Sequence, residues 1–129
     1  MRPLKILFVD DDQLILNAVR RSLRSEAFAI HATIDPHDVS RLITTLAIDV
    51  VVSDYVMPAM TGVELLRLVR SLHPDVVRVI LTGQAREHEL EENTTREGVA
   101  DHFLVKPWSD EALRNTFLTI AQARCQPGA

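Results

Sequence analysis

Residues 4–12 read "LKILFVDDD", an apolar run followed directly by three adjacent carboxylates. Like charges at neighbouring positions repel one another, and an apolar run beside them screens that repulsion poorly. A hard divalent cation relieves such repulsion, because Mg²⁺ prefers oxygen ligands and needs only one or two protein carboxylates. The stretch therefore predicts a strand that leads into a cation site.

Apolar, often β-branched runs recur along the chain and alternate with stretches of helical spacing. The strand-like runs are 4–9, 28–32, 49–53, 76–81 and 101–105, and the main helix-like stretches are 13–25, 36–46, 62–72 and 110–124. Most of the strand-like runs are nearly continuous rather than alternating, which is typical of strands covered on both faces. The alternation predicts a parallel sheet with helices on both faces.

Four of the expected helices carry start signals. Asp12 is placed to cap the first helix, and Asp35 precedes a proline that suits the first turn of the second. Thr61 and Glu64 have the spacing of a capping box, and Ser109 precedes two acidic residues. These signals give the expected helices defined beginnings.

Polar residues follow four of the five expected strands. In a sheet of this kind, ligands bind beyond the carboxyl ends of the strands, near the switch in strand order. The residues at these ends are Asp10, Asp11, Asp54, Thr82 and Lys106. Each alone is ordinary, since an Asp suits a turn and a Lys a solvated surface. Together they provide carboxylates for a cation, and a hydroxyl and an ammonium group for a phosphate.

Composition limits the possible classes of protein. The 129 residues fit one domain, with 47% hydrophobic and 25% charged residues. The net charge of −4 argues against nucleic acid as a partner, and Arg20, Arg21 and Arg24 are interpreted as a solvated helix face. No run approaches the roughly 18 apolar residues of a membrane span. Cys125 is the single cysteine, which favours a reducing, cytoplasmic environment.

Other familiar kinds of site find no match in the sequence. The four glycines form neither a dinucleotide-binding fingerprint nor a P-loop. The five histidines lack zinc-ligand spacing, and there is no G-x-S-x-G nucleophile elbow.

The sequence resembles the receiver domain of bacterial two-component response regulators, of the chemotaxis-regulator type. The matching segments are "ILFVDDD" at 6–12, "VVVSDYVMPAMTG" at 50–62, "VILTG" at 79–83 and "FLVKPW" at 103–108. The resemblance implies a flavodoxin-like, three-layer, doubly wound α/β fold. Its five-stranded parallel sheet would have the order 2-1-3-4-5 and be flanked by five helices. The receiver domain would span 1–125, with 126–129 as a tail or the start of a linker.

The same resemblance implies a role for each matching residue. It makes Asp54 the phosphoacceptor and also a ligand of Mg²⁺. Asp11 would bind Mg²⁺ directly, Asp10 mainly through a water molecule, and Val56 through its backbone carbonyl. Phosphoryl-binding and switch roles fall to Thr82, Lys106 and Phe103, and Val56 and Gln84 occupy positions that tune the phosphoryl lifetime. The bond between Lys106 and Pro107 is expected to be cis. Thr61 departs from the Asp that is usual before the glycine.

The expected function is a phosphorylation-dependent signalling switch rather than an enzyme with a separate substrate. A histidine kinase or phosphotransfer protein would donate the phosphoryl group, and an output domain or effector protein would respond. A homodimer on phosphorylation is also expected, without direct contact to nucleic acid or membrane. One alternative is a haloacid-dehalogenase-like phosphatase, although Val56 stands where that family has an acid. A degenerate receiver that only binds partners is a third interpretation.

One expected helix is unusual. The segment 85–97, "AREHELEENTTRE", contains five glutamates and only two apolar residues, Ala85 and Leu90. It cannot present a broad apolar stripe, so we expect it to be the most mobile helix and part of the signalling surface. A helix that frays and signals nothing is the alternative.

Overall fold

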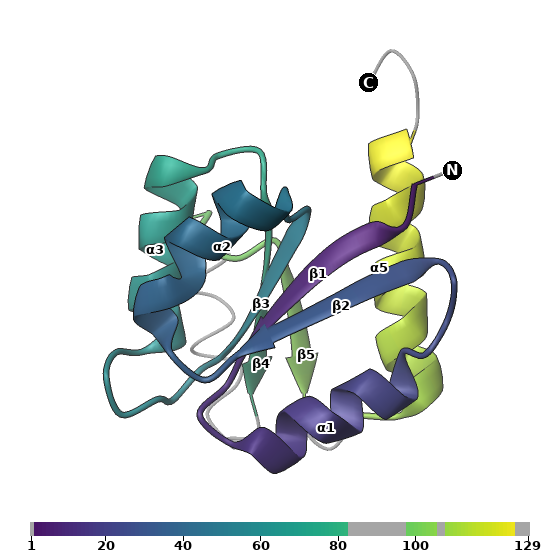
Figure 1. Cartoon of the computed structure of the whole chain (residues 1–129), viewed down its shortest axis with the longest axis horizontal. Coiled ribbons are helices and arrows are strands. Elements are labelled where there is room, and N and C mark those ends of the chain that lie inside the picture. Colours follow the sequence, from purple (N-terminus) through teal and green to yellow (C-terminus); the bar gives the residue numbers. More distant parts are fainter. Residues whose placement is uncertain (1, 83–97, 106–107, 126–129) are drawn as a thin grey trace.

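The structure, a computed structural model, describes residues 2–82, 98–105 and 108–125 (Figure 1). The strands are β1 (Leu4–Val9), β2 (Phe28–Thr33), β3 (Val50–Asp54), β4 (Val77–Thr82) and β5 (His102–Val105). The helices are α1 (Gln13–Ser22), the 3₁₀ turn η1 (Pro36–Asp38), α2 (Val39–Leu46), α3 (Gly62–Leu72) and α5 (Asp110–Cys125). The helix expected at 85–97 lies outside the described residues.

The five strands form one parallel sheet with the order β2-β1-β3-β4-β5, as the resemblance implied. From β1 the chain first adds β2 on one side, and β3 then pairs with the other side of β1. The direction of winding therefore reverses between β1 and β3. The carboxyl ends of these two strands flank the switch point where such sheets bind ligands.

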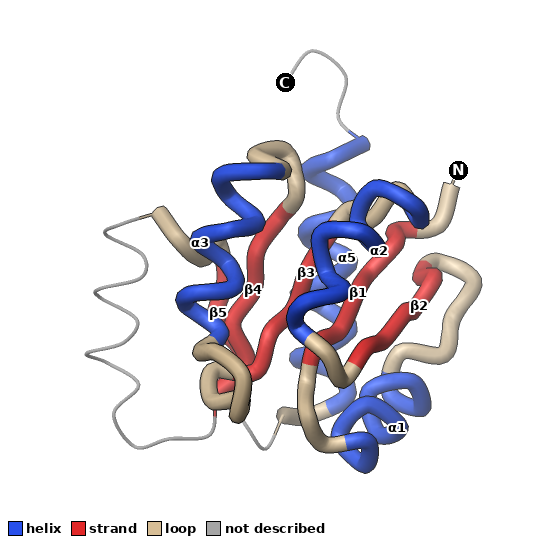
Figure 2. Tube along the Cα trace, turned by 60° about the vertical axis from the view of Figure 1, so that its left-hand side comes forward, coloured by secondary structure: helices blue, strands red, loops and turns tan. Residues whose placement is uncertain are grey.

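Helices cover both faces of the sheet, with α1 and α5 on one face and α2 and α3 on the other (Figure 2). Alternate residues of the central strands serve the two layers. In β3, Val50 and Val52 pack toward α1 and α5, whereas Val51 packs toward α2 and α3. These residues are at most 1% exposed, which explains why their strand reads as a continuous apolar run.

The predicted helix starts are confirmed. The Asp12 carboxylate accepts the Leu14 N–H at 2.9 Å, and the Thr61 hydroxyl accepts the Glu64 N–H at 3.1 Å. Asp35 accepts the N–H of residue 37 at 2.9 Å, and this hydrogen bond lowers the pKa of its carboxyl. The Ser109 hydroxyl accepts the N–H of residue 112 at 3.0 Å. Each cap satisfies a backbone donor that the helix leaves without an internal partner.

The boundaries of two expected helices differ from the prediction. The helix expected over 13–25 ends at Ser22, because the Ser25 hydroxyl accepts the Ala27 N–H at 3.1 Å and stabilises a turn instead. The stretch 36–46 begins as the short η1 before α2 starts. Leu72 fits the apolar spacing of the expected helix 62–72, but it is the last residue of α3 and is 60% exposed.

Candidate functional site

Three carboxylates meet at the switch point of the sheet. Asp10 and Asp11 follow the last residue of β1, and Asp54 is the last residue of β3. The two strands are hydrogen-bonded neighbours in which Val9 is paired with Ser53, so their ends reach the same edge together. One carboxylate oxygen from each aspartate lies within 4.8 Å of the others. The structure therefore brings together the acidic cluster that was predicted.

The three acids of the "DDD" run have different surroundings. Asp10 is 3% exposed, Asp11 is exposed, and Asp12 is exposed and caps α1. The Asp12 N–H donates to Asp10 Oδ1 at 2.9 Å and helps to orient that buried carboxylate. As predicted, the third acid serves the helix, and the first two belong to the cluster.

The chain that follows Asp54 is tied to the neighbouring strand. The Tyr55 N–H donates to the Leu81 carbonyl at 3.1 Å, which continues the pairing of β3 with β4 by one residue. Val56 comes next, and this residue is 57% exposed. This position carries a hydrocarbon side chain rather than an acid, which disfavours the phosphatase alternative.

The remaining predicted site residues fall into two groups. Thr82 is the last residue of β4, is 1% exposed, and is paired with Val105 of β5 at the edge that holds the acidic cluster. Phe103 is half-buried and packs against the apolar cluster beneath α2 and α3. Lys106 and Gln84 lie outside the described residues, as does the expected cis bond before Pro107.

The acidic cluster could hold a cation. Three carboxylates at this separation repel one another, and the burial of Asp10 strengthens the repulsion by reducing solvent screening. Oxygen ligands in such an arrangement suit a hard divalent ion. A cation there would bring positive charge close to Asp54, the last residue of β3. That charge would attract an anionic group to Asp54.

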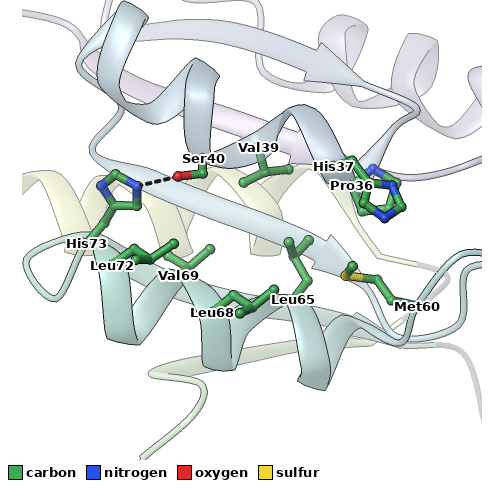
Figure 3. Close-up of a pocket in the computed structure, with 10 residues that line it drawn as sticks. All are labelled: Pro36, His37, Val39, Ser40, Met60, Leu65, Leu68, Val69, Leu72 and His73. Atoms are coloured by element: carbon green, nitrogen blue, oxygen red, sulfur yellow. Dashed lines mark hydrogen bonds between the residues drawn. The ribbon is translucent and has the colours of Figure 1, made fainter.

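A separate pocket of about 140 Å³ lies between α2 and α3 (Figure 3). The Ser40 hydroxyl and His73 Nε2 form a 2.9 Å hydrogen bond that links the two helices beside it. Its lining residues are Pro36, His37, Val39, Ser40, Met60, Leu65, Leu68, Val69, Leu72 and His73. None of these residues is a predicted site residue, so the pocket shares nothing with the acidic cluster.

A second buried carboxylate lies at the opposite edge of the sheet. Asp49 immediately precedes β3 and is 4% exposed. Its Oδ1 accepts hydrogen bonds from Arg2 and from Arg124 of α5, each at 3.3 Å, and its Oδ2 accepts the Lys5 N–H at 2.9 Å. Sequence reasoning did not find this group, because its members are up to 122 residues apart (124 − 2) and share no motif.

Among the described residues, no helix has both the length and the apolar character needed to span a membrane.

Known proteins similar to this chain are regulators. The response regulator MprA of Mycolicibacterium vanbaalenii is 34% identical over 111 residues, which are 86% of this chain and 47% of that protein. The hydrogenase transcriptional regulatory protein HoxA of Cupriavidus necator is 29% identical over 119 residues, 92% of this chain and 24% of that protein. The chain thus spans about half the length of MprA and about a quarter of that of HoxA.

Solved structures agree with this result. The signal receiver domain of an HD domain-containing protein from Pseudomonas fluorescens Pf-5 is 27% identical with a TM-score of 0.85, over 96% of this chain and 90% of that one. The chemotaxis response regulator CheY4 of Vibrio cholerae is 28% identical with a TM-score of 0.78, over 92% and 98%. The family model of the response regulator receiver domain matches residues 6–118. The chain therefore belongs to the family of response regulator receiver domains, the phosphoacceptor switches of two-component signal transduction.

Proposed function

We propose that Asp54 is the residue that accepts the phosphoryl group. The observation that carries the proposal is the juxtaposition of Asp54 with Asp10 and Asp11, whose carboxylate oxygens lie within 4.8 Å at the switch point of the sheet. Asp54 is half-buried, so its carboxylate is accessible to a donor, whereas Asp10 is almost fully covered. Accessibility therefore favours Asp54 over Asp10 as the nucleophile, and the family resemblance selects Asp54 over the exposed Asp11.

The proposed reaction is a transfer from a phosphohistidine of a histidine kinase or phosphotransfer protein. A carboxylate oxygen of Asp54 attacks phosphorus, a P–O bond forms, and the P–N bond breaks with its electron pair leaving on the imidazole nitrogen. That nitrogen then takes a proton from water. Such transfers depend on positioning and on offsetting negative charge.

The other predicted residues have supporting roles in this proposal. Asp11 and Asp54 would bind Mg²⁺ directly, Asp10 mainly through a water molecule, and the Val56 carbonyl would complete the protein ligands. Mg²⁺ in this position would offset the negative charge that builds up during the transfer. The buried Thr82 hydroxyl would donate to a phosphoryl oxygen, and Lys106 would pair with the same group. Phe103 would respond as the switch aromatic.

Acetyl phosphate with Mg²⁺ provides the direct test, because it supplies a phosphoryl group without a kinase. Intact-mass spectrometry is expected to show one added, acid-labile phosphoryl group on the wild type and none on the Asp54→Asn variant, which lacks the nucleophilic carboxylate. Asp12→Asn is the matched control within the acidic segment, since Asn caps a helix as well as Asp. Phosphorylation of the Asp54→Asn variant at the wild-type level would place the acceptor elsewhere.

The proposal extends to the partners and lifetime of the modified state. An output domain or effector protein would read the change at Asp54, and a homodimer on phosphorylation is one form that this response could take. HoxA is a transcriptional regulatory protein that is four times as long as the match, which leaves room for an output region. Val56 and Gln84 would set the rate at which the domain dephosphorylates its own Asp54.

The segment 85–97 is the proposed signalling surface, because it follows Thr82 in the chain and is poor in apolar residues. Hydrogen exchange with and without beryllofluoride, a phosphoryl mimic, tests this role. We expect faster exchange in 85–97 than in α5, and a change in protection on activation. A cytoplasmic location is also proposed, since one cysteine excludes a disulfide within the chain.

A further inference from the structure

We propose that Gly62 and Ser53 are positioning residues that hold the backbone of Asp54 in place. The inference rests on the proposed role of Asp54 as phosphoacceptor. Gly62 begins α3, and it approaches the end of β3 so closely that a Cβ atom on it would overlap the Asp54 carbonyl oxygen. The same atom would lie 3.1 Å from the Asp54 carbonyl carbon. A glycine is therefore required for the helix to lie directly against the acceptor residue.

Hydrogen bonds reinforce this close contact on both sides of Asp54. The Gly62 N–H donates to the Tyr55 carbonyl at 2.8 Å, which ties the start of α3 to the residue after the acceptor. The Ser53 hydroxyl, which belongs to a fully buried residue, donates to the Asp54 carbonyl at 2.9 Å. The Tyr55 N–H also donates to the Leu81 carbonyl of β4. The backbone of residues 53–55 is thus held by a helix, a strand and a buried hydroxyl.

Holding this backbone matters because the acidic cluster is assembled from two strands. Asp10 and Asp11 are carried by β1, and Asp54 by β3, so a shift of the Asp54 backbone changes the separation of their carboxylates. Magnesium demands oxygen ligands at about 2.0–2.1 Å in near-octahedral geometry and tolerates little displacement. Gly62 and Ser53 touch neither the metal nor the phosphoryl group in this scheme, and they act through Asp54.

Gly62→Ala is the main test. The added methyl group has to move the backbone by on the order of 1 Å, a misplacement that can lower a rate about 100-fold. We expect the rate of phosphorylation by acetyl phosphate, at saturating Mg²⁺, to fall by about that factor, and the Kd for Mg²⁺ to rise about tenfold. Leu4→Ala is the matched control, because it removes a buried side chain at the far end of β1 and weakens the fold without touching the cluster.

Both variants are measured at a temperature at which urea unfolding shows them to be folded. In one outcome, Gly62→Ala loses only stability, as Leu4→Ala is expected to do, and keeps the wild-type phosphorylation rate and Mg²⁺ affinity. That result would overturn the inference. Phosphorylation of the Asp54→Asn variant at the wild-type rate would instead refute the proposed acceptor. The two failures are therefore distinguishable.

Ser53→Ala provides a second and milder variant in case Gly62→Ala does not fold. It removes the hydroxyl that donates to the Asp54 carbonyl, and we expect the Kd for Mg²⁺ to rise about tenfold, as for other outer partners of metal ligands. An unchanged Kd would count against the inference. In the Gly62→Ala background, Ser53→Ala removes a contact of 3.1 Å with the new methyl group but leaves the overlap with the Asp54 carbonyl. If the double variant recovered the wild-type phosphorylation rate, the harmful contact of the Gly62→Ala methyl group would be with Ser53 and not with the Asp54 backbone. That result would overturn the inference.

Discussion

Asp10 and Asp49 are both buried carboxylates of the same sheet, but they lie at opposite ends of its strands and beside different groups. Asp49, at the amino-terminal edge of β3, accepts hydrogen bonds from two arginines and a backbone N–H. Asp10, at the carboxyl-terminal edge of β1, shares its surroundings with two further carboxylates. Two arginine side chains bring positive charge to the first carboxylate, whereas the second lies in a group of three carboxylates that could hold a cation.

The difference shows how one fold separates stability from chemistry. A buried charge paired within the chain fixes the strands and helices around it, and removing it leaves its partners uncompensated. A cluster of like charges opposes folding slightly and gains its stabilisation when a cation arrives. Burial alone therefore does not distinguish the two roles, whereas a group of three carboxylates marks a place where a cation could bind.

The largest expected effect is on Asp49. Asp49→Ala removes the common acceptor of Arg2, Arg124 and the Lys5 N–H, and we expect the free energy of unfolding to fall by about 3 kcal/mol. This value is at the lower end of the range for buried pairs, because the Arg2 side chain is 65% exposed and retains much of its hydration. Urea unfolding measures the loss, and Mg²⁺ affinity is expected to be unchanged.

Asp38→Ala is the control for this comparison. Asp38 forms a 3.6 Å ion pair with Arg41 on the surface of α2, and both side chains are largely solvated. Its loss is expected to cost less than about 1 kcal/mol. Equal losses for the Asp38 and Asp49 variants would show that the partners of Asp49 contribute nothing beyond a surface pair.

Asp10→Asn is expected to act on the response to Mg²⁺. Asn keeps an oxygen that can accept the Asp12 N–H but removes one carboxylate from the group of three, so the variant should bind Mg²⁺ more weakly. Mg²⁺ at ten times its Kd for the wild type should stabilise the wild type by about 1.4 kcal/mol and the variant by less. Thermal melts at low salt, with Mg²⁺ and with EDTA, measure the two gains. Equal stabilisation of the two proteins by Mg²⁺ would mean that Asp10 contributes nothing to the cation site.

A smaller effect is expected at the start of α3. Thr61→Ala removes the hydroxyl that caps this helix and bonds Glu64, at an expected cost of about 1 kcal/mol in unfolding free energy. Thr61→Asp should retain the cap and most of the stability, and it restores the residue that is usual in the family. Equal stability of the Ala variant and the wild type would remove capping as the reason for Thr61.

The smallest effect concerns His31 on β2. Burial lowers its pKa, and the positive charges of Arg20 and Lys5 lower it further. The unfolded chain therefore binds more protons than the folded protein just below about pH 6.5, and stability falls as the pH drops from that value to the lowered pKa. His31→Gln should make the melting temperature less sensitive between about pH 7.5 and about pH 5.5. Identical pH profiles would contradict this assignment.

The sequence predicted the parallel sheet and the acidic cluster for physical reasons that the structure makes clear. Continuous apolar runs such as Val50–Val52 report burial on both faces, and polar residues that directly follow parallel strands must meet at one edge. Caps such as Asp12 and Thr61 are local hydrogen bonds between residues two or three apart, so their motifs are readable in the sequence. The strand order came from the family resemblance.

Contacts between distant segments were not predictable in this way. No local pattern reveals that Arg2 and Arg124 converge on Asp49, because each arginine alone looks like a solvated charge. The contact between Gly62 and the Asp54 carbonyl depends on how α3 returns to the sheet, which the glycine alone does not specify. Leu72 fits the apolar spacing of its helix, but α3 ends there, and only packing decides whether a terminal residue is covered.

Phe117 has a consequence for the order in which the protein can fold during synthesis. This fully buried residue of α5 makes edge-to-face contacts with Phe8 of β1 and Phe28 of β2, at ring-centroid distances of 5.8 and 6.3 Å. The ribosome makes both strands long before it makes α5, so their aromatic rings remain without this cover while most of the chain emerges. The final closure of this layer therefore waits for α5, and nascent chains that stall before residue 117 expose an apolar surface that chaperones can recognise.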